Sequence, residues 1–141
     1  MEKEIANRLS DREVRFTKGR REVIAALVTA DGPRSAAELH TIIGNKVPLS
    51  SLYRSLAVLE ETGVVVPHFA TKGLARYELA EWLKGHHHHL VCVDCGAVED
   101  VEVPTTVERR LETIVTEVAT TSEFLPFDHA LEIEGRCSKC A

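Results

Sequence analysis

The chain has 141 residues, a hydrophobic content of 44% and a formal net charge of −5. No apolar run reaches the roughly 18–20 residues that span a bilayer, and the charged N-terminus lacks the apolar stretch of a signal peptide, so a cytoplasmic protein is expected. The composition excludes a disordered chain, and with only seven aromatic residues the core must be mainly aliphatic.

Charge is divided unevenly along the chain. Residues 1–85 hold 13 basic and 11 acidic side chains, whereas residues 86–141 hold 4 and 11. The stretch 8–21 alone carries six basic residues against two acidic ones, and the second half contains all four cysteines and five of the seven histidines. This asymmetry predicts different partners for the two halves.

The first two predicted helices are marked by capping signals. Thr17 is the expected N-cap of a helix with apolar residues at helical spacing, which ends at Asp31-Gly-Pro. Ser35-Ala-Ala-Glu38 is a predicted capping box at the start of the second helix, which ends at Gly44.

A third helix and a hairpin complete the first half. The helix is expected to begin at Ser50 or Ser51 and to end near Gly63. Strands are expected at 64–66 and 76–79, around the turn Thr71-Lys-Gly73. Three short helices and a hairpin predict a winged helix-turn-helix domain over residues 1–80, although an ordinary three-helix core without a DNA role fits the same pattern.

The start of the third helix favours the DNA-binding interpretation. A recognition helix places its N-terminal residues near base edges, where hydroxyl groups can bind phosphate and arginine can pair with guanine. The side chains gathered there are Ser50, Ser51, Tyr53 and Arg54. The alternative is that Tyr53 is partly core and that Arg54 is a solvated surface charge.

Two cysteine pairs predict a structural zinc site. Cys92-Val-Asp-Cys95 and Cys137-Ser-Lys-Cys140 each present two thiolates, and together they complete a tetrahedral shell of four sulfurs with no open position. A redox role would call for a βαβ context that neither pair has, and disulfides would call for export.

Four consecutive histidines, His86 to His89, run into an expected strand. Because successive strand residues face opposite sides, His86 and His88 would serve one metal, and His87 and His89 another. Two imidazoles do not hold a metal strongly, so further ligands are needed. The candidates for these ligands are His68, Glu78, Glu108 and His129. The alternatives to metal binding are that the histidine run is a remnant of a purification tag or a solvated polar strand.

The remainder of the second half is expected to form an α/β unit. A strand is predicted over 98–103, a helix beginning near Pro104, and a strand over 129–134 that alternates apolar and polar residues. A unit of about 55 residues is marginal on its core alone, so zinc and dimerisation are expected to support it.

Several segments together resemble the ferric uptake regulator (Fur) superfamily. They are His86-His-His-His-Leu-Val-Cys-Val-Asp-Cys-Gly96, His129-Ala-Leu-Glu-Ile-Glu-Gly-Arg-Cys137, the closing Cys-Ser-Lys-Cys140, Leu49-Ser-Ser-Leu-Tyr-Arg-Ser-Leu56 and Arg15-Phe-Thr-Lys-Gly-Arg20. The resemblance implies an α+β protein with a winged helix-turn-helix domain (1–80), a hinge (81–85) and a small α/β metal-binding dimerisation domain (86–141). It also implies a homodimeric, metal-dependent repressor that binds palindromic operators and is not an enzyme.

The resemblance also implies roles for individual residues. The structural zinc falls on Cys92, Cys95, Cys137 and Cys140, a second metal on His86, His88, Glu108 and His129, and the regulatory metal of the hinge on Glu78, His87 and His89. Arg15, Lys18 and Arg20 join the DNA-binding residues. Further hinge ligands seen in relatives are replaced here by Pro33, Val66 and Ala80, so His68 or a water is expected to complete that site.

The histidine run resembles zinc-sensing members of the superfamily, which favours zinc over iron(II) as the regulatory metal. Carboxylates among the ligands keep iron open. A zinc hydrolase or a metal chaperone is the alternative of a different class, but no general-base motif accompanies the histidines, and neither role explains the basic winged helix.

Overall fold

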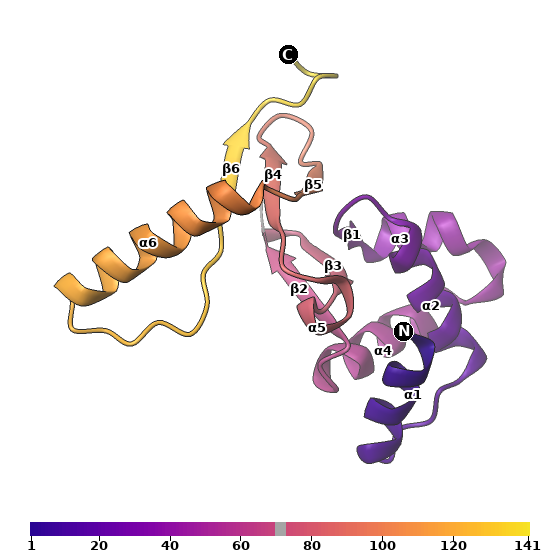
Figure 1. The fold of residues 1–141 in the computed structure, drawn as a ribbon. Helices are drawn as coiled ribbons and strands as arrows, with labels where there is room; N and C mark the ends of the chain where they lie inside the picture. The colour runs from indigo at the N-terminus through magenta and orange to yellow at the C-terminus, as the bar shows by residue number, and fades with distance from the viewer. Residues whose placement is uncertain (70–72) are drawn as a thin grey trace.

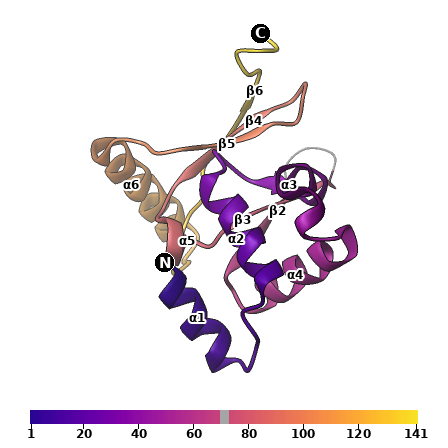
Figure 2. The same ribbon diagram turned by 90° about the vertical axis from the view of Figure 1, so that its right-hand side faces the viewer.

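The computed structural model describes residues 1–69 and 73–141, whose helices and strands form two parts (Figure 1). The first part contains α1 (Glu2–Asp11), α2 (Lys18–Thr29), β1 (Arg34–Ser35), α3 (Ala36–Ile43), the 3-10 turn Gly44–Lys46, α4 (Leu49–Glu61), β2 (Val65–Phe69) and β3 (Ala75–Leu79). Its strands form an antiparallel sheet in the order β1-β3-β2. Figures 1 and 2 show the four helices gathered at one side of the β2–β3 hairpin, as in a winged helix.

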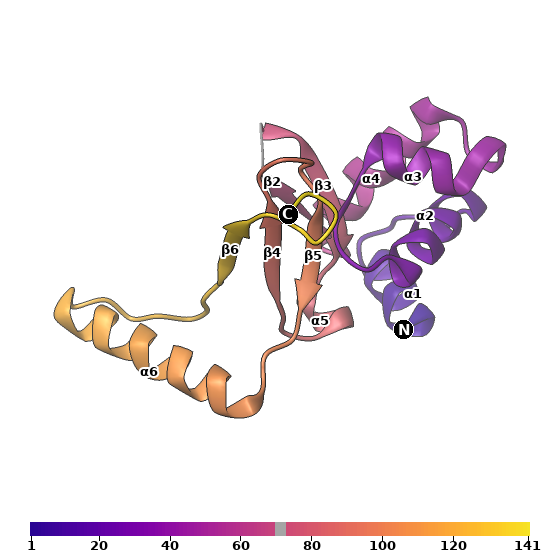
Figure 3. The ribbon, with the colours of Figure 1, turned by 90° about the horizontal axis from the view of Figure 1, so that it is seen from above.

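The short helix α5 (Glu81–Lys84) leads from this part into the second. There β4 (His88–Cys92) lies between β5 (Val98–Val101), which is antiparallel to it, and β6 (Glu132–Gly135), which is parallel. The long helix α6 (Thr105–Thr121) connects β5 to the segment before β6 and extends away from the sheet, on the opposite side from α1–α4 (Figure 3). The α+β fold class is therefore confirmed.

The capping signals of the sequence are confirmed. The Thr17 hydroxyl accepts a hydrogen bond from the Arg20 N–H, and the Ser35 hydroxyl and Glu38 carboxylate form a reciprocal capping box over 3.0–3.1 Å. The third predicted helix starts at Leu49, with Pro48 as its N-cap, slightly earlier than expected.

Other element boundaries differ from the predictions. Helix α1 was not predicted, the strand expected over 98–103 ends at Val101, and the one expected over 129–134 begins only at Glu132. In the predicted turn, Thr71 and Lys72 lie outside the described residues, and Gly73 has a φ of 70° that suits glycine.

The core of the first part is aliphatic, as the composition predicted. Ile5, Leu9, Leu39, Leu52 and Leu59 are completely buried within it. The aromatic rings of Phe16 and Tyr77 pack only against its edge. The α6 side of the second part is far less buried, and Ile114 and Val118 on α6 are exposed by 52% and 63%. Among the described residues, no helix is long and apolar enough to cross a lipid bilayer.

Candidate metal centres and nucleic-acid interface

Strand β4 and its flanking residues contribute potential metal ligands to three clusters of four residues. In each cluster, four residues bring one potential ligand atom apiece within 4.8 Å of the others. The cysteine cluster is Cys92, Cys95, Cys137 and Cys140, the dimerisation-domain cluster is His86, His88, Glu108 and His129, and the hinge cluster is Glu78, His87, His89 and Asp100.

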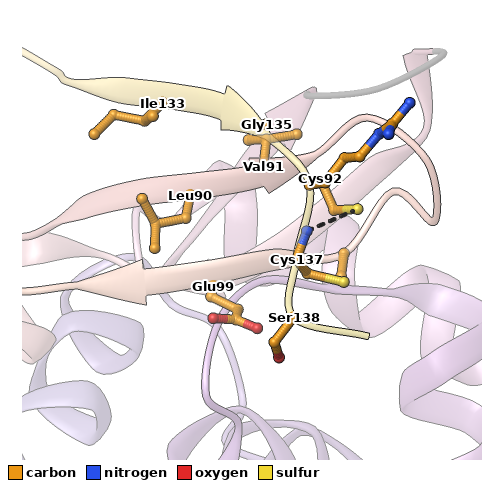
Figure 4. Close-up of a pocket in the computed structure, with 10 residues that line it drawn as sticks. Leu90, Val91, Cys92, Glu99, Ile133, Gly135, Cys137 and Ser138 are labelled. Carbon is orange, nitrogen blue, oxygen red and sulfur yellow. Dashed lines mark hydrogen bonds between the residues drawn. The ribbon is translucent and has the colours of Figure 1, made fainter. Parts of the chain in front are cut away.

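The cysteine cluster joins the two predicted knuckles. The parallel pairing of β4 with β6 carries the second knuckle to the first, and the Cys137 N–H points at Cys92 Sγ over 3.4 Å (Figure 4). Cys95 Sγ and Cys137 Sγ lie 3.8 Å apart, and none of the four residues is in a disulfide. A tetrahedral zinc with Zn–S bonds of about 2.3 Å would hold its sulfurs about 3.8 Å apart, so this spacing fits the ion.

The thiols in this cluster differ in acidity. Hydrogen bonds from the backbone N–H groups of Cys95 and Cys137 lower the pKa of Cys92 to about 6. Hydrogen bonding to the Cys137 and Cys92 sulfurs raises the pKa of Cys140 to about 12. Four adjacent thiolates are therefore stable only around a cation, which the closed arrangement of sulfurs would hold as a structural support.

The dimerisation-domain cluster is centred on Glu108 in the first turn of α6. Its carboxylate lies 2.9 Å from His86 Nε2, 2.8 Å from His88 Nε2 and 2.6 Å from His129 Nε2. Hydrogen bonding to His88 holds the pKa of the Glu108 carboxyl below its usual range, against the effect of burial. Three imidazoles and one carboxylate are a ligand set for zinc or a similar divalent cation.

The hinge cluster gathers side chains from both parts of the chain. Glu78 on β3 is 5% exposed, and its two carboxylate oxygens lie 2.8 Å from His89 Nε2 and 3.0 Å from His87 Nε2. His87 Nδ1 lies 2.9 Å from the Gly85 carbonyl oxygen, which can only accept, so Nδ1 carries the proton. In the neutral imidazole, Nε2 therefore presents a lone pair to the Glu78 carboxylate, an arrangement that calls for a cation between them.

Asp100 is the fourth member of the hinge cluster and was missed in the sequence. It is the register partner of His89 across β4 and β5, and its Oδ1 lies 3.3 Å from His89 Nε2 and 3.4 Å from His87 Nε2. Oδ1 is also buried without a hydrogen-bond partner, which again indicates space for a cation. In the sequence, the only sign of this ligand was an acidic residue in the strand that follows the histidines. Its closeness to His89 becomes clear only when the register between β4 and β5 is known.

His68, the expected completing ligand, lies beside the hinge cluster and outside it. Its ring centroid is 4.4 Å from that of His89, and its Nε2 is 3.3 Å from Glu132 Oε1. Burial, together with the charge of His89, lowers the pKa of His68. Asp100, and not His68, therefore lies with the other three residues of the cluster, and the completion of the site by His68 or a water stays a prediction.

Charge pairing in the hinge cluster shifts two pKa values. Burial by itself would lower the pKa of His89, but pairing with the carboxylates of Asp100 and Glu78 outweighs it and raises that pKa to about 9. Burial would likewise raise the pKa of Asp100, but pairing with His89 and Lys84 brings it down to about 2. The cluster thus binds a proton tightly at the position where a metal would be coordinated.

The two parts of the chain also meet through direct contacts near the hinge cluster. The Asp100 N–H donates to the Asp31 carbonyl oxygen over 3.1 Å, which joins β5 to the loop after α2. The Trp82 indole N–H in α5 donates to the Gly63 carbonyl oxygen over 2.8 Å, and the Arg8 guanidinium lies 4.2 Å from the ring centroid of Trp82. These contacts hold β5 and α5 against the first part of the chain.

The predicted DNA-binding side chains lie at the N-termini of α2 and α4. Tyr53 is 54% exposed, and Arg15, Lys18, Ser50 and Arg54 are exposed as well. Arg20, Ser51 and Arg54 line one groove. The N-cap residue Pro48 provides no side-chain hydrogen bond, so backbone N–H groups of the first turn of α4 remain available to a phosphate.

Comparisons with known proteins agree with this arrangement. The model of the ferric uptake regulator family matches residues 11–134. The ferric uptake regulation protein of Bacillus subtilis is 34% identical over 110 residues, which are 75% of this chain and 70% of that protein. The protein of the same name from Neisseria meningitidis serogroup B is 31% identical over 137 residues, which are 94% of this chain and 90% of that protein.

Solved structures show the same likeness. The Vibrio cholerae ferric uptake regulator is 28% identical with a TM-score of 0.72, and the match covers 94% of this chain and 98% of that one. The Helicobacter pylori regulator, described as having three functional metal binding sites, is 26% identical with a TM-score of 0.77, over 98% of this chain and 92% of that one.

Proposed function

The chain belongs to the ferric uptake regulator family, whose members are regulators and not enzymes, and on this premise we propose that it is a metal-responsive, DNA-binding transcriptional repressor. We infer that it acts in the cytoplasm as a homodimer and binds palindromic operators when metal is bound. The observation that carries the proposal is the hinge cluster, because its ligands come from both the wing and the second part of the chain.

The proposed mechanism is a shift in population between arrangements of the two parts. Glu78 belongs to the wing, and His87, His89 and Asp100 belong to the second part. Joint coordination of one cation by these residues would favour a single separation of the two winged helices of a dimer, matched to the two half-sites of an operator. The coupling is reciprocal, so operator DNA would tighten metal binding by the same factor.

Zinc is the proposed regulatory metal, with iron(II) as the alternative. Two imidazoles and two carboxylates suit zinc, and the all-histidine run favours it further. The second carboxylate, Asp100, is the specific observation in favour of iron(II), because harder oxygen ligands also suit that ion. The cysteine cluster would hold a separate structural zinc.

The homodimer is proposed from exposed apolar side chains in the second part. Besides those on α6, the segment after this helix exposes Phe124 by 70%, Leu125 by 74% and Phe127 by 93%. A monomer rarely leaves so much contiguous apolar surface in water, so a second copy of the chain is the expected cover.

A gel-shift titration with a library of palindromic operators tests the proposal. The full-length protein, with its structural zinc retained, would be titrated with Zn²⁺, with Fe²⁺ under anaerobic conditions, or with a chelator. We expect a metal-dependent shift at lower free Zn²⁺ than Fe²⁺, with a stoichiometry of one dimer per operator. Binding that does not depend on any metal, or the lack of any shift, would contradict the function.

A further inference from the structure

We propose that Lys84 acts as a built-in counter-ion of the hinge cluster, which competes with the regulatory metal and sets the metal concentration at which the protein responds. This inference rests on the proposed function, because it assigns a role to a residue that is not a ligand. Lys84 ends α5, in the short segment between the two parts of the chain.

The Lys84 ammonium contacts both carboxylates of the hinge cluster. Its Nζ hydrogen-bonds to Asp100 Oδ2 and lies 3.9 Å from Glu78 Oε2. The two carboxylates are largely removed from water, with side-chain exposures of 6% for Glu78 and 14% for Asp100. Two buried negative charges so close together need a compensating cation, and Lys84 supplies one.

The charge balance makes this ammonium a competitor. Once a metal has displaced the proton of His89, both imidazoles are neutral, and Glu78, Asp100 and Lys84 carry a combined charge of −1. A divalent cation would bring the cluster to +1 if Lys84 stayed, but to zero if Lys84 left. An ammonium has no lone pair and cannot become a ligand, so in this poorly solvated site it can only repel the metal.

Lys84 also has a route out of the cluster. Its side chain is 25% exposed, and its flexible stem allows the ammonium to move into solvent while its aliphatic part stays packed. Departure of the ammonium would free Asp100 Oδ2, while the bound metal would give Oδ1 the partner that it lacks. Metal binding and the loss of the Lys84 contact are therefore expected to be one exchange of cations.

The location of Lys84 connects this exchange to the winged helix. Two residues earlier in α5, Trp82 is hydrogen-bonded to Gly63 in the turn after α4. The helix α5 is thus attached to the first part through Trp82 and to β5 through Lys84. When a metal replaces the Lys84 ammonium, the contact between Lys84 and Asp100 is lost, and Asp100 is held by the metal.

The test is a Zn²⁺ titration against a chromophoric chelator, performed on the full chain with its structural zinc retained. A His86→Ala background removes a ligand of the dimerisation-domain cluster, so the hinge cluster dominates the titration. Lys84→Gln should bind Zn²⁺ at least about tenfold more tightly, the scale found for groups adjacent to metal ligands. Lys84→Arg, which keeps the charge, should stay within about threefold of the parent protein.

Lys46→Gln is the matched control, because it makes the same change in net charge. Lys46 has a side-chain exposure of 68% and lies 4.0 Å from Glu22 in the first part of the chain. Its substitution should leave the affinity unchanged. Co²⁺ absorption should keep its wavelength and intensity in Lys84→Gln, which would show that the ligand geometry is preserved while the affinity rises. Lys84→Met provides a second uncharged variant, and thermal unfolding checks the fold of each.

Unchanged or weaker Zn²⁺ binding by both uncharged variants would overturn the proposal for Lys84, as would an equal gain in Lys46→Gln. The metal site itself is tested separately by Glu78→Ala. Zinc binding that persists in Glu78→Ala would refute the hinge site and the role of Lys84 together. Binding that is lost in Glu78→Ala but unaltered in Lys84→Gln would refute the role of Lys84 alone.

Discussion

Replacing Gly32 by alanine tests whether the metal response depends on close contact between the two parts of the chain. Gly32 lies in the loop after α2 and packs directly on β5. A Cβ atom there would lie 2.4 Å from the Val98 carbonyl oxygen, 3.0 Å from Glu99 Cα and 3.2 Å from the Asp100 N atom. All three are backbone atoms of a paired strand, so they cannot move aside as a flexible side chain could.

The magnitude follows from the cost of overpacking. Inserting one methyl group into such a contact costs about 1–3 kcal/mol, either as strain or as separation of the two parts. Separation would break the hydrogen bond from the Asp100 N–H to the Asp31 carbonyl oxygen and shift the candidate ligand Asp100. If the metal-bound arrangement requires this contact, the affinity for the regulatory metal should fall by about 5–150-fold, and by linkage the metal-dependent gain in operator affinity should fall similarly.

The assay combines zinc titration with fluorescence anisotropy of a labelled operator, at saturating metal and with chelator. Gly135→Ala is the control, because a Cβ atom at Gly135 meets nothing within 4 Å. Thermal unfolding should show that the winged helix itself remains folded in Gly32→Ala. Wild-type zinc affinity and wild-type operator binding in Gly32→Ala would refute the idea that this contact belongs to the active arrangement.

Three further predictions concern the clusters themselves. His87→Ala should leave a folded dimer in sedimentation experiments but weaken metal-dependent operator binding by at least about tenfold, and unchanged operator affinity with metal present would contradict the hinge site. Cys137→Ala should unfold or monomerise the second part, visible by calorimetry and sedimentation, since an incomplete shell no longer holds zinc; a stable zinc-loaded dimer would disprove this. Because the pKa of His89 is raised to about 9, its ion pairs stabilise the metal-free protein fully below pH 6.5, and that stability is lost as the pH rises through 9. Metal must displace the same proton, so zinc affinity should increase by up to about tenfold per pH unit between pH 6.5 and 9, and a pH-independent affinity would contradict the assignment.

Local signals made much of the first part predictable from sequence. Thr17 and Ser35 mark helix starts through hydrogen bonds to residues only three positions away, so no tertiary information was needed. Helix α1 was missed because Ile5 and Leu9 are its only buried residues, too few to give a clear apolar stripe. Its stability comes from packing on the core, which a local pattern does not reveal.

The part of the candidate site that lies in one short segment, His86 to His89, was predictable from the sequence. The alternation of a strand was enough to separate His86 and His88 from His87 and His89, and the structure brings each pair to a different cluster. Asp100 was not predictable in the same way, because its contact with His89 depends on the register of β4 and β5. His68 was named on residue type alone, and its nearness to His89 did not make it part of the cluster.

Candidate ligands for all three clusters lie within the ten residues from His86 to Cys95, and this has a consequence for how such a protein can change during evolution. Substitutions at the even-numbered histidines alter one cluster without touching the other, so the metal preferences of the two can diverge independently. An insertion or deletion of one residue next to this strand has the opposite effect. It would turn every side chain to the other face and exchange the ligands of both clusters at once. The spacing between Gly85 and Cys92 should therefore tolerate changes of residue type far better than changes of length.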